Sequence, residues 1–199
     1  MKHLGDITNI NGAEIEPVDV ITAGSPCQDL SVAGKRAGLD GERSGLFMEQ
    51  IRIIKEMRDA DRRRNNRSGE LIRPRYMVWE NVPGALSSNK GEDFRCVLEE
   101  TARIVQEDAV IPRPENGKWS YSGCIVGNRW SIAWRIHDAQ FWGVPQRRKR
   151  IALVADFGGG SAPEILFVRK GLSRDTKPCF QERQGTAADP EGCIGESDK

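Results

Sequence analysis

The chain has 199 residues, of which 38% are hydrophobic and 30% charged, and its formal net charge is +1. This composition predicts one globular domain with a sizeable core and excludes a membrane span, which needs a run of roughly 18 apolar residues. The N-terminus lacks the pattern of a secretory signal, so a cytoplasmic protein is expected. The five cysteines never form a C-x-x-C pair, which indicates neither a disulfide framework nor a metal site.

The first predicted elements are a strand, a loop and a helix. The β-branched run over 18–23 predicts a buried strand, and the Gly-, Lys- and Arg-rich segment 28–45 predicts a mobile loop. A helix is predicted to begin near Ser44, because apolar side chains recur on one of its faces. These side chains are Phe47, Ile51, Ile54 and Met57.

The middle of the chain predicts two more strands and a second helix, separated by loops. The arginine-rich segment 59–70 is expected to be a loop, and 76–79 a second buried strand. An amphipathic helix fits 92–106, and the segment 108–123, which contains Pro and Gly, is expected to be a loop. Apolar and polar residues alternate over 130–138, which predicts a half-exposed strand.

A fourth strand is predicted over 151–154, and the alternation of strands with helices predicts an α/β fold. Beyond Phe157 the chain is rich in Gly, Pro, Lys, Asp and Glu. Residues 1–157 are therefore expected to form the main domain, and 158–199 a flexible tail or the start of another domain.

Three polar clusters lie at or beside the ends of predicted strands, where open α/β sheets bind their ligands. They are Pro26-Cys27-Gln28, Glu80-Asn81-Val82 and Gln146-Arg147-Arg148-Lys149-Arg150. Each has an ordinary alternative: a lone cysteine is usually a small buried side chain, Glu80 could be a helix cap or a surface ion pair, and basic clusters are usually solvated. A carboxyl at a strand end can also be partly desolvated, which favours its protonated form.

Taken together, the clusters resemble the DNA (cytosine-5) methyltransferase family. The segment 24–31 resembles its Pro-Cys nucleophile motif, and 34–47 its catalytic loop and following helix. Glu80-Asn81-Val82 matches its Glu-Asn-Val motif, and 141–150 its Gln-x-Arg-x-Arg motif. Gly5-Asp6-Ile7 is similar to a short motif near the cofactor adenine. The motifs follow the family order over residues 4–157.

The resemblance implies a Rossmann-like catalytic domain that methylates C5 of cytosine in DNA with S-adenosylmethionine as methyl donor and no metal. By resemblance, Cys27 adds to C6 of the base and Glu80 donates to N3, while Arg148 and Arg150 stabilise the developing charge and the thiolate. Asn81 is expected to fix the turn that aims Glu80 and Cys27. Because C5 is hidden in duplex DNA, the base must be flipped out of the helix.

Further contacts are implied by the same resemblance. The residues expected to bind the DNA substrate are Pro26, Gln28, Asn81, Val82 and Gln146 around the base, with Lys35, Arg36 and Arg43 of the loop on phosphates. The residues expected at the cofactor are Asp6, Ile7, Pro26 and Leu46.

The sequence departs from the family pattern at both ends. The family's glycine-containing cofactor loop and the acidic residue for the cofactor ribose are not found before Pro26, and no target-recognition domain follows Phe157. A domain truncated at both ends is expected, with an exposed sheet edge, poor cofactor affinity and association with complementary fragments of a split enzyme.

Two other functions remain open on the sequence. One is a catalytically incomplete remnant that only binds nucleic acid through its arginine clusters. The other is an RNA cytosine methyltransferase, because a tRNA-modifying branch shares the Pro-Cys and Glu-Asn-Val motifs. For the DNA enzyme, the expected setting is a restriction-modification system or phage DNA methylation.

Overall fold

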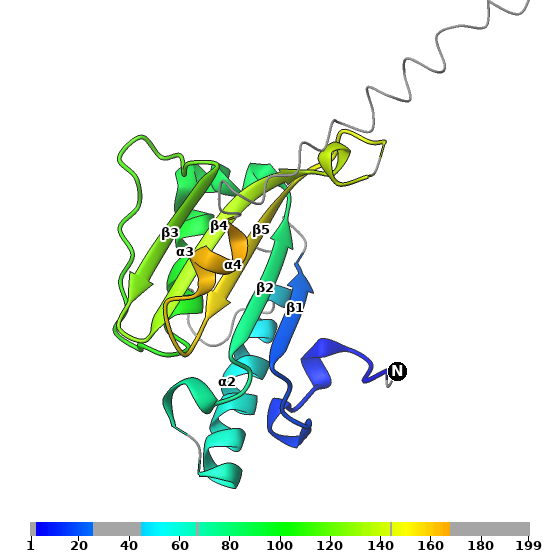
Figure 1. Ribbon diagram of the computed structural model, residues 1–199, viewed down its shortest axis with the longest axis vertical. Helices are drawn as coiled ribbons and strands as arrows, with labels where there is room; N and C mark the ends of the chain where they lie inside the picture. The colour runs from blue at the N-terminus through cyan, green and yellow to red at the C-terminus, as the bar shows by residue number, and fades with distance from the viewer. Residues whose placement is uncertain (1–2, 26–44, 67, 144, 168–199) are drawn as a thin grey trace, which may run out of the picture.

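The computed structural model describes residues 3–25, 45–66, 68–143 and 145–167, which form a five-stranded sheet with helices on both faces (Figure 1). The strands are β1 (Val20–Gly24), β2 (Tyr76–Asn81), β3 (Ser122–Gly127), β4 (Trp130–Asp138) and β5 (Lys149–Asp156). The helices are α2 (Leu46–Asn65), α3 (Glu92–Ala102) and α4 (Ala162–Leu166). Short 3-10 turns are η1 (Ile7–Asn9), η2 (Gly12–Glu14), η4 (Gly69–Leu71), η5 (Pro83–Leu86), η6 (Ser88–Gly91) and η7 (Ala139–Trp142). The expected α/β class is confirmed.

The strand order β1-β2-β5-β4-β3 brings distant parts of the sequence to one edge. β1 and β2 are parallel, whereas β5 is antiparallel to both β2 and β4. The C-terminal ends of β1, β2 and β4 therefore meet the beginning of β5. We call this the upper edge, as it lies in Figure 1; it comprises Gly24, Glu80–Asn81, Asp138 and Lys149–Arg150.

The main core lies between the sheet and the two longer helices, α2 and α3. Trp79 is fully buried at its centre, with ring centroids 6.0 Å from Phe47 of α2 and 6.4 Å from Phe94 of α3. The apolar face predicted for the first helix is thus the face that packs on the sheet. Burial of such large side chains supplies most of the stabilisation in a fold of this kind.

The loop expected over 59–70 is wrong for its first half, because α2 continues to Asn65. Arg58 and Asp61 are buried on this last part of the helix, and Arg58 donates to the carbonyls of Ile72 and Phe157 at 3.1 and 3.3 Å. Burial lowers the pKa of Arg58 to about 10, which leaves the guanidinium charged at neutral pH. The consecutive arginines 62–64 lie in the last helical turn, where cations favour the helix dipole.

The opposite face of the sheet is covered by α4 and the loop that precedes it. Ala162 and Leu166 pack on Ala133 and Val154 in a second, smaller core. Asp156, at the end of β5, accepts hydrogen bonds from the backbone N–H groups of Gly158 and Ser161. The described part of the segment expected to be a tail, 158–167, is therefore packed against the sheet.

The segment expected to be a loop over 108–123 ends in a strand that the sequence analysis did not predict. β3 pairs with β4 through the turn Asn128–Arg129, in which Arg129 has a φ of 63°. Gly123 lies under the Trp134 indole, whose nearest atom would be 2.4 Å from an added Cβ. The first half of β4 is buried rather than half exposed, because Trp130, Ile132 and Trp134 enter the main core.

β1 is an edge strand with alternating exposure, not the fully buried strand that was expected. No described strand pairs with its outer side. The chain before it packs along α2, where the Gly12 N–H donates to Glu56 at 2.7 Å and Arg52 donates to the carbonyls of Ile7 and Ile10. None of the described helices is long and apolar enough to cross a bilayer.

Candidate active site

Glu80 and Arg150 form an ion pair at the upper edge. The Arg150 Nε lies 2.8 Å from Glu80 Oε1, although the two residues are far apart in the sequence. Both side chains point to the face that carries α4, since alternate residues of β2 and β5 enter the main core. The structure thus joins two of the three predicted clusters.

The pair is only partly buried, with Glu80 50% and Arg150 31% exposed. The desolvation expected for Glu80 stays a prediction, because residues 26–44, which follow β1 in the sequence, lie outside the described residues. A partly exposed pair contributes at most about 1 kcal/mol, because water screens it and ordering of the side chains opposes it.

Asn81 joins the end of β2 to the end of β1. Its buried amide Nδ2 donates to the Ser25 carbonyl at 2.9 Å, and its Oδ1 accepts from the Val82 N–H at 2.8 Å. The Trp79 indole N–H donates to the Ser25 hydroxyl at 2.9 Å. Ser25, which the sequence analysis did not single out, is therefore fixed through both its backbone and its side chain.

Gly24 leaves room for the Glu80 carboxylate at the end of β1. The two residues are register partners, and a Cβ added to Gly24 would come within 3.3 Å of Glu80 Oε2. This distance is tighter than an ordinary contact, so a side chain here would displace the carboxylate. A glycine at the last position of β1 thus lets Glu80 extend over the chain that continues to Ser25.

The connection from β4 to β5 carries the third cluster and is closed at its base by Asp138. The Asp138 Oδ1 accepts from the N–H groups of Arg148 and Gln140, at 3.1 and 3.3 Å. Burial opposes ionisation of Asp138, but these hydrogen bonds and nearby Lys149 together lower its pKa. Arg148 and Gln146 have exposed side chains on this connection. The structure brings Arg150, but not Arg148, into a described contact with Glu80.

Two aromatic side chains on η7 are exposed beside this cluster. Trp142 packs edge-on against His137 of β4, with ring centroids 5.5 Å apart, and Phe141 precedes it. Burial and the neighbouring Arg135 lower the pKa of His137, which favours the neutral imidazole.

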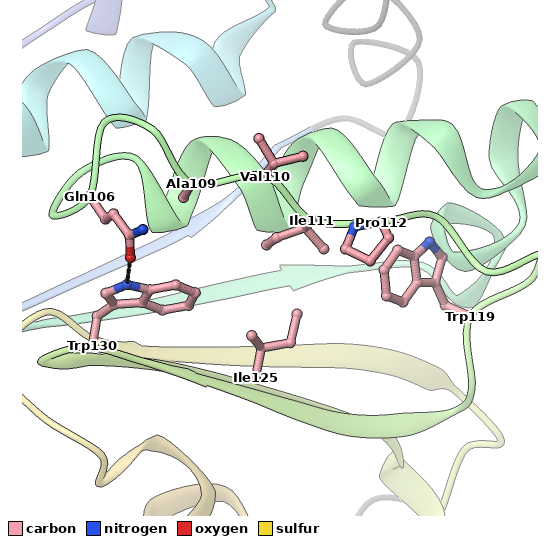
Figure 2. A pocket seen from close by; sticks show the side chains of 8 residues that line it. All are labelled: Gln106, Ala109, Val110, Ile111, Pro112, Trp119, Ile125 and Trp130. Atoms are coloured by element: carbon pink, nitrogen blue, oxygen red, sulfur yellow. Dashed lines mark hydrogen bonds between the residues drawn. The ribbon is translucent and has the colours of Figure 1, made fainter.

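An apolar cavity of about 330 Å³ lies elsewhere, between the chain after α3 and the β3–β4 hairpin (Figure 2). At one end the Trp130 indole N–H donates to Gln106 at 3.0 Å, as Figure 2 shows. None of the residues predicted for catalysis lines this cavity. Within the described ranges, no group of three or more His, Cys, Asp or Glu residues could hold a metal ion.

Comparison with known proteins assigns the family. Residues 1–104 match the family model of C-5 cytosine-specific DNA methylases. The chain belongs to this family. Its α/β sheet with helices on both faces agrees with the Rossmann-like fold expected of such a methyltransferase.

Several curated proteins are similar to this chain. A protein of Escherichia phage P1 named DNA N-6-adenine-methyltransferase is 36% identical over 213 residues, which covers 94% of this chain and 27% of that protein. The type II methyltransferase M.BsuFI of Bacillus subtilis is 31% identical over 153 residues, or 77% of this chain and 28% of that protein. The chain spans less than a third of the length of these two curated relatives.

Among solved structures, the Dnmt2 methyltransferase of S. pombe aligns with 87% of this chain and 44% of its own, at a TM-score of 0.45 and 15% identity.

Three of the residues expected at the cofactor are described, and they lie on η1 and at the start of α2. The exposed Asp6 caps η1, where its Oδ1 accepts from the N–H and the hydroxyl of Thr8, both at 2.9 Å. The Ile7 carbonyl accepts from Arg52 of α2, and Leu46 begins the same helix with 40% of its surface exposed. The exposure of Asp6 and Leu46 leaves both side chains accessible to a ligand, and their role at the cofactor stays a prediction.

Several residues predicted for the site lie outside the described residues. They are Pro26, Cys27, Gln28, Lys35, Arg36 and Arg43. Two cysteines are described, and neither is near the Glu80–Arg150 pair in sequence or register. Cys96 is buried on α3, where burial raises the pKa of its thiol, and Cys124 is exposed on β3. A structural role fits the former, because a raised pKa disfavours the nucleophilic thiolate.

Proposed function

We propose that this chain is the central catalytic part of a DNA methyltransferase that transfers a methyl group from S-adenosylmethionine to C5 of cytosine. The observation that carries the proposal is the meeting of Glu80 and Arg150, 2.8 Å apart, at the edge where β1 leads into Ser25. Residues of two family motifs are thereby in contact, which supports a shared site. Relatives named type II methyltransferases support a setting in restriction-modification or phage DNA methylation, with a cytoplasmic location.

Chain connectivity supports a role for Cys27 at the same place. Cys27 follows Ser25 by two residues, and two residues span at most about 7 Å. Asn81 holds the Ser25 carbonyl next to Glu80. A thiol, a carboxyl and a guanidinium can thus act on one base, which is the set that methylation of C5 requires.

The chemistry explains why this set is needed. The Cys27 thiolate forms a bond to C6, and the electron pair of the C5–C6 double bond shifts toward C4 while that of the C4–N3 double bond shifts onto N3. The ring becomes an enamine in which C5 is nucleophilic. Glu80 donates at N3, where negative charge develops, and cationic Arg148 and Arg150 stabilise that charge. S-adenosylmethionine, when bound, supplies an electrophilic methyl group. Loss of the C5 proton and cleavage of the bond between sulfur and C6 then restore the aromatic ring and the thiolate.

The partly exposed pair of Glu80 with Arg150 suits this role. Because such a pair contributes at most about 1 kcal/mol, Glu80 can exchange Arg150 for the N3 and amino edge of an entering cytosine at little cost. Arg150 then remains beside the base. The target must leave the duplex to reach this edge. Lys35, Arg36 and Arg43, which come between β1 and α2 in the sequence, are the cations proposed to bind DNA phosphates.

The name of the phage P1 relative favours a second candidate, methylation of adenine at N6. An exocyclic amine can take a methyl group through its own nitrogen lone pair, without a covalent bond between the enzyme and the ring. Under that alternative Cys27 would not be required for turnover. The retained Pro26-Cys27 and Glu80-Asn81-Val82 sequences favour the cytosine reaction.

A labelled-methyl assay with duplex DNA, followed by digestion to nucleosides, tests the proposal. The product is expected to be 5-methylcytosine, Cys27→Ala should abolish it, and Glu80→Gln should slow it by roughly 100-fold or more. DNA that contains 5-fluorocytosine, which has no C5 proton to lose, should trap a covalent adduct at Cys27 that mass spectrometry detects. Cys124→Ala, on exposed β3, and Glu107→Gln, on an exposed loop, are matched controls that should retain wild-type rates.

Each alternative has its own outcome in this assay. N6-methyladenine as the product, with Cys27→Ala still active, would establish the adenine reaction. Methylation of RNA but not DNA would establish the RNA enzyme. Binding of DNA with neither methyl transfer nor an adduct would identify a non-catalytic remnant.

A further inference from the structure

Trp142 is the most exposed of the five tryptophans in the chain. It is 64% exposed on η7, whereas Trp79, Trp130 and Trp134 are buried in the main core and Trp119 is half buried. Its neighbour Phe141 is 45% exposed. Two adjacent aromatic side chains held in water need an explanation, because each would contribute more to stability if it were buried.

A continuous row of contacts connects Trp142 to the proposed catalytic pair. The Trp142 ring packs on His137, His137 is the register partner of Arg150, and Arg150 is paired with Glu80. His137, Arg150 and Glu80 all lie on the face of the sheet that carries α4. Trp142 therefore lies at the upper edge, on the same face as the Glu80 carboxylate.

The surroundings of Trp142 are positively charged. Arg148 and Lys149 have exposed side chains on the adjoining chain, and Arg135 is close enough to lower the pKa of His137. The nearest acidic side chain on β4, Asp138, is buried and accepts hydrogen bonds from the backbone. An aromatic surface bordered by cations complements a polyanion with flat rings.

We propose that Trp142 is a stacking surface for a DNA base next to the target cytosine. The inference rests on the proposed function, since base flipping at the upper edge leaves neighbouring bases with one unstacked face. Trp142 covers such a face with its indole, Phe141 extends the apolar surface, and the adjoining cations bind the flanking phosphates. Stacking of this kind accepts every base, because every base has a π-face.

Fluorescence titration of the chain with a single-stranded DNA oligonucleotide tests the inference. We expect quenching of tryptophan emission, loss of that quenching in Trp142→Phe, and wild-type affinity in this variant because the phenyl ring still stacks. Trp142→Ala should weaken binding by about fivefold or more, measured by anisotropy of a labelled oligonucleotide. Inorganic polyphosphate, which has the charge but no bases, should bind without quenching Trp142.

Leu71→Ala is the matched control, because Leu71 is also 64% exposed but precedes β2 at the opposite edge of the sheet. Wild-type DNA affinity is expected for this variant. The inference is overturned if Trp142→Ala binds the oligonucleotide as tightly as the wild type, if polyphosphate quenches equally, or if the chain binds no DNA. Loss of self-association in Trp142→Ala with unchanged DNA binding would instead assign Trp142 to a protein contact.

Comparison with Cys27→Ala separates this inference from the proposed function. The variant should bind DNA and show the same quenching at Trp142 while it forms no product. Trp142-dependent binding in a chain that never methylates cytosine would uphold the stacking surface and contradict the proposed function. Cytosine methylation with unchanged DNA affinity in Trp142→Ala would uphold the proposed function and contradict the stacking surface.

Discussion

Asn81 shows how one side chain fixes the geometry of the upper edge. It is buried, and its amide both donates to the Ser25 carbonyl and accepts from the Val82 N–H. The sequence motif predicted that Asn81 fixes a turn, but it gave no partner, because the partner is on another strand. Glu80 and Arg150 were expected at one site for chemical reasons, whereas their ion pair depends on the register of β2 and β5.

Asp156 is a buried acid at the end of β5, on the edge of the sheet opposite the upper edge. Its carboxylate has no exposed surface and accepts from Arg75 at 3.1 Å, from the Gly158 N–H at 2.9 Å and from the Ser161 hydroxyl at 2.6 Å. Burial alone would raise the pKa of Asp156, but these hydrogen bonds outweigh it and the pKa is lowered. Asp156→Asn should therefore reduce the free energy of unfolding by about 1–3 kcal/mol at neutral pH.

The pH dependence of that loss follows from the lowered pKa. A carboxyl with a lower pKa in the folded state contributes stability above its unfolded pKa of about 3.9, and this contribution is lost as the pH falls through the folded value. Denaturant unfolding should thus show a constant difference between wild type and Asp156→Asn from pH 5 to 8, and a shrinking difference below about pH 4. Asp108→Asn, at an exposed position, should show no such difference; a gap that widens in acid would contradict this account.

At the scale of elements, period and composition predicted α2, α3 and four of the five strands, with differences mainly at their ends. The prediction failed where tertiary contacts override local preference. Arginine-rich sequence looked like a loop, yet burial of Arg58 and Asp61 extends α2 to Asn65. β3 was missed because glycines disfavour strands, and the indole rings that cover Gly123 and Gly127 come from the partner strand.

The contribution of the close contact between Gly123 and the Trp134 indole to stability can be tested by substitution. Gly123→Ala places a methyl group 2.4 Å from the Trp134 ring, so the buried indole must shift. We expect a loss of about 1–3 kcal/mol in the free energy of unfolding, measured by denaturant titration. Gly160→Ala is the control, since an added Cβ there meets nothing within 4 Å; equal stability of the two variants would refute the packing argument.

For the molecule as a whole, the sequence predicted an α/β sheet but not its strand order. β1 and β2 follow one another along the chain and pair in parallel, whereas β5, the last strand in sequence, is inserted between β2 and β4 through contacts between distant segments. The exposed sheet edge expected from the sequence is seen at β1 for the described strands. Val20 on this strand is 47% exposed, and such edges can pair with another chain.

Sedimentation velocity over a range of concentrations can test the β1 edge. We expect concentration-dependent association of the wild type and weaker association of Val20→Lys, because a charged edge strand opposes pairing. Thermal stability should change by less than about 0.5 kcal/mol, as is usual for an exposed position. Val110→Lys, on an exposed loop outside the sheet, should associate like the wild type. A monomeric wild type at all concentrations would show that the outer side of β1 is already covered.

Hydrogen bonds at the base of the β4–β5 connection separate the sequence of its tip from the position of the strands. The Ala139 N–H donates to the Arg148 carbonyl at 3.0 Å, and Asp138 accepts from the Arg148 N–H, so the two ends of the connection are tied together. Residues 140–146 can therefore be exchanged as a cassette while Arg150 keeps its place in the sheet. If the chain acts on DNA as proposed, replacement of this loop tip alone changes the contacts to the bases around the target and leaves the sheet unchanged.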